Sequence, residues 1–177
     1  QSSTGGEASV AADDSSMSQN SSEPLPAVDL NDPNNRVERQ VLEVLVQVPT
    51  GYTKQQLLRI LSAGMTARTH QALLEYIAGG ISAGKSIAEL YASAPENLGL
   101  RLRELAVAGL PAKDEESLAK YAAGVVKRAL EIALSREKNE LLAQLRRTDA
   151  DLDPKQYDLI QRALVDIEAE RRSLQDG

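Results

Sequence analysis

The sequence predicts an all-α protein: a compact helical bundle followed by a long helix and a C-terminal helical hairpin. Apolar and small residues recur at the spacing of one helical face from Asp114 to Arg147, and in alternating steps of three and four from Asp153 to Gln175. The connection Arg147 to Leu152 is short enough to fold these two helices back on each other. Helix-capping patterns also precede several other helical segments.

Residues 1–32 are predicted to form a disordered linker that is acidic and rich in serine. Large apolar side chains are scarce there, so the segment cannot bury enough surface to offset the entropy of ordering. Because the chain begins with Gln1, we expect it to be a piece of a longer protein. Residues 1–35 contain no Lys or Arg, and their six acidic residues account for the net charge of −6: Glu7, Asp13, Asp14, Glu23, Asp29 and Asp32.

The rest of the chain is electrically neutral, because its 20 acidic residues balance the 20 basic ones. A neutral surface lacks the field that attracts nucleic acids, and without Phe or Trp few side chains can stack on bases. We therefore expect no strong direct binding to nucleic acid. No apolar run approaches the roughly 20 residues that span a bilayer, so no membrane partner is expected and the cytoplasm is the expected location.

Residues 33–130 are predicted to form the bundle subdomain, which opens with two short helices. Asp32-Pro33 provides a capping acceptor and a proline for the first helix, which stops at Pro49. Thr53–Gln56 fits a capping box for the second helix, which ends near Gly64.

Three further short helices complete the predicted bundle. Thr66 is expected to cap the third helix and Gly79-Gly80 to end it. Ser86–Glu89 is another capping box, for the fourth helix. Pro95 opens the fifth helix, which closes at Gly109.

Residues 131–177 are predicted to form the hairpin subdomain. Asp153 is expected to cap the last helix, with Pro154 at its first position and Gln156 able to close a capping box. The seam that faces the long helix consists of Tyr157, Ile160, Leu164, Ile167, Arg171 and Leu174.

Opposite this seam, the last helix presents a candidate partner-binding surface. It mixes an exposed valine with polar and charged side chains, and its members fall within about 80° on a helical wheel. We call it the docking strip, and it consists of Asp158, Gln161, Val165, Glu168 and Arg172. An ordinary solvated helix surface is the alternative interpretation of any single member.

The segment Gly79–Ser86 fits the P-loop pattern G-x-x-x-x-G-K-[ST]. A P-loop needs a buried strand before its glycine-rich turn, so that the helix after it faces the phosphates. Here the preceding Ala67–Ala78 has the periodicity of an amphipathic helix. The segment is therefore expected to connect two helices.

No catalytic residue, metal site or cofactor is expected in this chain. Asp149, Asp151 and Asp153 alternate as in a calcium loop, but Pro154 and Ile160 occupy positions that need glycine and glutamate. The chain has a single histidine, His70, which is expected to be a packed or capping side chain. Since cysteines are absent, disulfides and thiolate ligands are excluded.

Four segments resemble a known family. They are Ala67–Leu74, Gly79–Gly84, Leu118–Val126 and Glu168–Leu174. Together they are similar to the C-terminal helicase-binding domain of bacterial DNA primase (DnaG-type), in its actinobacterial form. The resemblance covers residues 33–177, and Lys85 departs from the family loop.

The resemblance implies a non-catalytic interaction domain that couples primer synthesis to the replication fork on the nucleoid. In that family a helical bundle modulates the hexameric replicative helicase (DnaB-type), and a helical hairpin docks on the helicase N-terminal domains. Single-stranded DNA-binding protein is the second partner expected from the resemblance, and primer synthesis belongs to other domains of the primase. Two alternatives stay open: the N-terminal helical domain of a replicative helicase, which shares the bundle-plus-hairpin design, and a P-loop nucleotide-binding protein.

Overall fold

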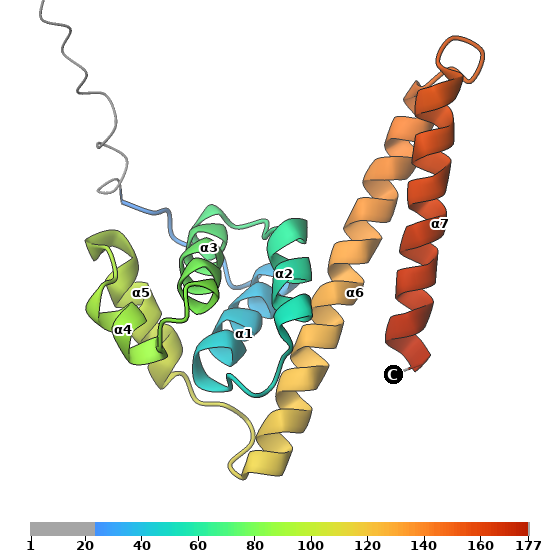
Figure 1. Ribbon diagram of the computed structural model, residues 1–177. Helices are drawn as coiled ribbons and strands as arrows, with labels where there is room; N and C mark the ends of the chain where they lie inside the picture. The colour runs from blue at the N-terminus through green and yellow to red at the C-terminus, as the bar shows by residue number, and fades with distance from the viewer. Residues whose placement is uncertain (1–23, 177) are drawn as a thin grey trace, which may run out of the picture.

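The computed structural model describes residues 24–176, and every regular element in this range is a helix (Figure 1). The prediction of an all-α protein is therefore confirmed. The predicted disorder of residues 1–23 lies outside the described residues. The helices are α1 (Pro33–Gln47), α2 (Lys54–Ala63), α3 (Arg68–Ser82), α4 (Ile87–Ala92), α5 (Glu96–Val107), α6 (Glu115–Arg147) and α7 (Pro154–Asp176).

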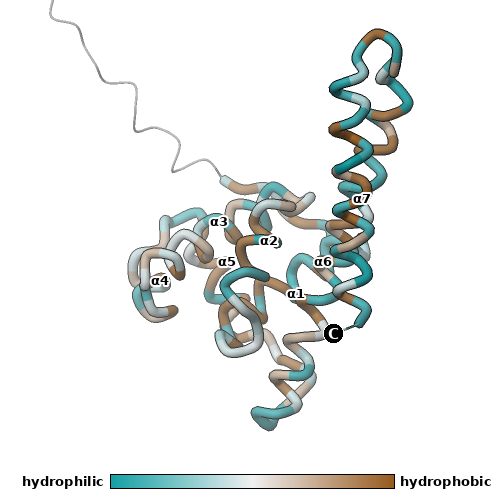
Figure 2. Tube along the Cα trace, turned by 45° about the vertical axis from the view of Figure 1, so that its right-hand side comes forward, coloured by the Kyte–Doolittle hydropathy of each residue, from teal (hydrophilic) through white to brown (hydrophobic). Residues whose placement is uncertain are grey.

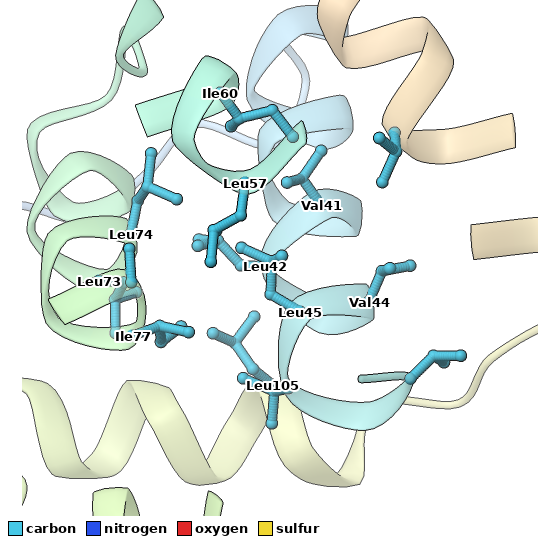
Figure 3. Packing of buried hydrophobic residues seen from close by; sticks show 14 of the residues in the cluster. Val41, Leu42, Val44, Leu45, Leu57, Ile60, Leu73, Leu74, Ile77 and Leu105 are labelled. Atoms are coloured by element: carbon cyan, nitrogen blue, oxygen red, sulfur yellow. The ribbon is translucent and has the colours of Figure 1, made fainter. Parts of the chain in front are cut away.

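Helix α1 forms the centre of the bundle. Every residue from Val41 to Val46 is buried, so this part of α1 is covered on all sides rather than along one stripe. Figure 3 shows the side chains of Val41, Leu42, Val44 and Leu45 surrounded by apolar residues of α2, α3 and α5. Since burying a Val or Leu side chain contributes about 1.5–3 kcal/mol, the buried residues of α1 contribute strongly to the stability of the bundle.

Predicted capping residues stand at the starts of α1, α2, α4 and α7, and Asp32 accepts the N–H of Asn34 at 2.8 Å to begin α1. Thr53 and Ser86 each form a complete capping box, with Gln56 and Glu89 respectively. The carboxylate of Asp114 accepts the backbone N–H of Ser117 at 2.9 Å and begins α6. Asp153 accepts the N–H of Gln156 at 3.0 Å and begins α7.

The structure corrects both predicted ends of α3. The helix continues through Gly79-Gly80 to Ser82, because Gly80 serves packing rather than termination. A Cβ atom at Gly80 would lie 2.0 Å from Leu90 Cδ2, so only glycine lets α4 approach α3 this closely. At the other end the N-cap residue is Ala67, and the hydroxyl of Thr66 instead donates to Glu38 Oε1 at 2.7 Å.

The last part of the predicted linker lies against the bundle. Residues 24–29 are non-helical, yet Leu25 packs partly buried on the core. The Thr69 hydroxyl donates to the carbonyl oxygen of Pro26 at 2.6 Å. This hydrogen bond holds the segment 24–29 against α3.

Helix α6 links the bundle to the hairpin without a break. Its N-terminal part packs on α1 and α2, while its C-terminal part projects away and pairs with α7 (Figures 1 and 2). The boundary predicted between residues 130 and 131 falls inside this helix, and Leu134 beyond it is completely buried. Within residues 24–176, none of the helices is long and apolar enough to cross a membrane.

Candidate functional site

Helix α7 has one face packed on α6 and one face open to solvent. In the predicted seam, Ile160 and Ile167 are only 3% and 7% exposed, whereas Leu164 is half-buried. The two isoleucines are the only buried residues of α7, so its apolar contacts follow a single line. Most of the α7 surface therefore remains available to a partner.

The open face carries most of the docking strip. Asp158, Gln161 and Arg172 are exposed, and the Val165 side chain between them is 65% exposed. An exposed valine flanked by polar groups suits an interface with a dry centre and a wet rim.

A shallow hollow of about 370 Å³ lies on this face. Three residues of the docking strip line it: Asp158, Gln161 and Val165. Arg162 and Asp166 complete the lining, although the helical wheel did not select them. Arg162 precedes Val165 by three residues, and residues at this spacing are neighbours on a helix surface, so the sequence could have identified Arg162.

Glu168, the remaining member of the docking strip, is turned toward α6. Its carboxylate accepts a hydrogen bond from the Lys138 ammonium of α6, and Arg171 Nη1 lies 3.3 Å away. The hydrogen bond from Lys138 lowers the pKa of Glu168 below its ordinary value. The placement of Glu168 opposite the seam is therefore corrected: it joins the two helices at the edge of their interface.

Two further apolar side chains are exposed toward the turn of the hairpin. Leu152, in the connection between the helices, is 85% exposed, and Leu159 on α7 is 58% exposed. Sequence reasoning missed both residues, because it placed Leu152 in a solvated connection and Leu159 outside the strip. An Asx turn holds this connection, in which Asp149 Oδ1 accepts the N–H of Asp151 at 2.9 Å.

An ion-pair network joins the base of the hairpin to the bundle. Arg59 of α2 binds Glu137 of α6 with two parallel hydrogen bonds of 2.7 and 2.8 Å. Its Nε donates to Glu170 of α7 at 2.8 Å. These hydrogen bonds raise the pKa of Arg59, so one guanidinium connects three helices in its charged form.

The P-loop-like segment has no geometry for a phosphate. Gly79 and Gly80 are inside α3, so a helix stands where a P-loop requires a strand. The backbone N–H groups that would cradle a phosphate already donate to carbonyl oxygens: Gly84 to Ile81 at 3.0 Å and Lys85 to Gly80 at 2.9 Å. The segment connects two helices, as the sequence predicts.

His70 is a packed side chain, as expected from the sequence. It is 5% exposed, and its Nδ1 lies 3.0 Å from Glu38 Oε2. Burial alone would raise the pKa of Glu38, but hydrogen bonds from His70, Thr66 and Ala67 outweigh burial and lower it. The pair joins α1 to α3 inside the bundle.

Comparison with known proteins gives one structural match. No protein-family model matches the sequence, and neither does any curated protein. Among solved structures the chain is similar to the helicase-binding domain of primase from Mycobacterium tuberculosis, with a TM-score of 0.60 and 28% sequence identity. The match covers 80% of this chain and 91% of that domain, and it confirms the resemblance seen in the sequence.

Proposed function

We propose that this chain is a helicase-binding domain of a bacterial replicative primase, with no catalytic activity of its own. The observation that carries this proposal is the structural match, because it spans nearly the whole of the similar domain at 28% identity. The partner would be the N-terminal domains of the hexameric replicative helicase. Binding would couple primer synthesis to the replication fork, in the cytoplasm at the nucleoid.

We further propose that the open face of α7 makes the helicase contact. The seam isoleucines are used in packing on α6, so a partner has to meet the opposite side of the helix. The centre of that contact would be Val165, with Gln161, Arg162 and Arg172 around it. Asp158 would lie at the edge, and Glu168 would act indirectly by holding α7 on α6.

The test is size-exclusion chromatography and calorimetry with the helicase N-terminal domain from the same organism. The wild-type chain is expected to co-elute with that domain. The double variant Val165→Asp, Arg172→Ala should lose about 1–2 kcal/mol of binding free energy per truncated contact, or roughly tenfold in affinity for each 1.4 kcal/mol. Lys120→Ala, on the exposed start of α6, is a matched surface control that should bind like wild type.

Each failure of this experiment has its own meaning. Unchanged binding by the double variant would move the contact off α7, most directly onto the bundle. Assembly of the chain into rings without added helicase would favour a helicase N-terminal domain. ATP binding that is lost in Lys85→Ala would restore the nucleotide-binding alternative. Single-stranded DNA-binding protein stays a predicted second partner, and the same chromatography tests it.

A further inference from the structure

A second surface lies on the bundle, away from α7. It is a groove of about 630 Å³ between α1, α6 and the connection from α2 to α3, and we call it the α1/α6 groove. This volume falls in the range of sites that hold specific ligands. Its apolar lining includes Val37, Ile60, Met65, Ala129 and Ile132.

The groove is held open by hydrogen bonds on two sides of the α2–α3 connection. From α6, Arg136 Nη2 donates to the carbonyl oxygens of Ala63 and Gly64, the latter at 2.8 Å. From α1, the Glu38 carboxylate accepts hydrogen bonds from Thr66 and from the N–H of Ala67, the latter at 3.2 Å. Because these hydrogen bonds fix the α2–α3 connection, it needs little reorganisation when a partner binds, and the entropic cost of binding is lower.

The polar residues around the groove carry mostly negative charge. Glu38, Glu131 and Glu140 line it: the Glu38 carboxylate is already bonded to His70 and Thr66, whereas Glu131 and Glu140 are exposed at the rim, the latter 3.4 Å from Arg147. Arg136 is the basic residue of the lining, and its guanidinium is directed at backbone carbonyl oxygens of the wall. Electrostatic complementarity therefore favours an occupant that combines apolar side chains with Lys or Arg.

We infer that the α1/α6 groove is a docking site for a basic amphipathic helix of a partner protein. Apolar side chains of that helix, spaced by three and four residues, would pack on Met65, Ala129 and Ile132, which are partly exposed. Its Lys or Arg residues would face Glu131 and Glu140. The acidic N-terminal segment of this chain, with six acids and no base before residue 36, has the wrong charge to occupy the groove.

This inference goes beyond the proposed helicase contact, because no α7 residue lines the groove. A loss of helicase binding at Val165 and a loss of peptide binding at the groove are therefore separate results.

The probe is a fluorescein-labelled synthetic helix of about 18 residues, with Leu along one face and Lys on the other. Fluorescence anisotropy with the full chain measures its affinity, and NMR chemical-shift changes locate it. A second peptide with the same Leu pattern and Glu in place of Lys serves as the charge control. The Lys peptide is expected to bind with shifts around Ile132, and the Glu peptide at least tenfold more weakly.

Two variants with matched controls test the groove. Ile132→Asp, which puts a charge among the apolar side chains, should weaken the Lys peptide about tenfold or more, whereas Leu100→Asp on the exposed face of α5 should not. Glu131→Lys should weaken binding several-fold at low salt, whereas Glu116→Lys near the start of α6 should not. Because Glu131 is exposed, Glu131→Lys should stay folded, and its peptide affinity tests the groove even if Ile132→Asp fails to fold.

Three results would overturn the inference. One is equal binding of the Lys and Glu peptides, and another is wild-type affinity in both Ile132→Asp and Glu131→Lys. The third is self-association of the chain that Ile132→Asp abolishes, with no peptide binding. In that case the groove would be an interface between two copies.

Discussion

Helices α1 and α7 are embedded in the molecule in opposite ways. Of the 15 residues of α1, seven are buried, whereas α7 has 23 residues and buries two. The buried stretch of α1 from Val41 to Val46 has no exposed face and stabilises the helices around it, while only the first turns of α1 reach the α1/α6 groove. A helix attached along one seam contributes less to stability and leaves its outer face open, which is the arrangement that an adaptor needs.

The largest expected effect is on the bundle. Leu45→Ala, at a fully buried site of α1, should lower the free energy of unfolding by about 2–5 kcal/mol, because it leaves a cavity between α1 and its neighbours. Urea denaturation followed by circular dichroism measures this loss. A loss under about 1 kcal/mol would show that the buried side chains of α1 contribute little to the stability of the bundle.

A smaller and more local effect is expected in the hairpin. Ile167→Ala should lower the free energy that holds α7 on α6 by about 2 kcal/mol or more, because Ile167 is one of the two buried residues of α7. Hydrogen exchange should show faster exchange of α7 amides while α1 amides stay protected. Equal loss of protection in both helices would mean that bundle and hairpin unfold as one unit. The difference in burial between α1 and α7 would then not correspond to a difference in local stability.

The link between the two regions should depend on pH. Hydrogen bonding to Arg59 lowers the pKa of Glu137 below its ordinary 4.5. The contribution of the Glu137–Arg59 ion pair to the free energy of unfolding is therefore fully present above about pH 4.5. It is lost as the pH falls through the lower pKa that Glu137 has in the folded state.

Arg59→Met should remove this pH dependence. At neutral pH the substitution should cost about 1 kcal/mol, since the pair is partly exposed to solvent. Arg101→Met, which removes the more exposed pair with Glu104, is the control. Thermal melts of the three proteins from pH 3 to 7 check this, and an unchanged acid profile in Arg59→Met would assign the dependence to other carboxylates.

The smallest effect on folding is expected on the open face of α7. Val165→Asp should change the free energy of unfolding by about 0.5 kcal/mol or less, because Val165 is 65% exposed. The same substitution is expected to weaken helicase binding, so stability and binding separate at this residue. A large drop in melting temperature would place Val165 in a packed contact instead.

The sequence by itself determined the helices and most of their limits. Capping residues act within one helical turn, so Asp32, Thr53, Ser86 and Asp153 mark helix starts that the sequence alone identifies. The period of the apolar residues in the last helix identified Ile160 and Ile167 as its seam for the same local reason. The candidate site was predicted to this extent, as the face opposite a seam.

Only the tertiary structure decided what each position meets across the fold. Gly80 was expected to end α3, but it lies inside the helix, where the missing side chain makes room for Leu90 of α4. Glu168 was assigned to the docking strip although it follows the seam residue Leu164 by one helical turn, and only the fold shows that Lys138 of α6 binds it there. The Arg59 network and the α1/α6 groove likewise join segments far apart in the sequence, and a residue pattern along one helix carries no information about such neighbours.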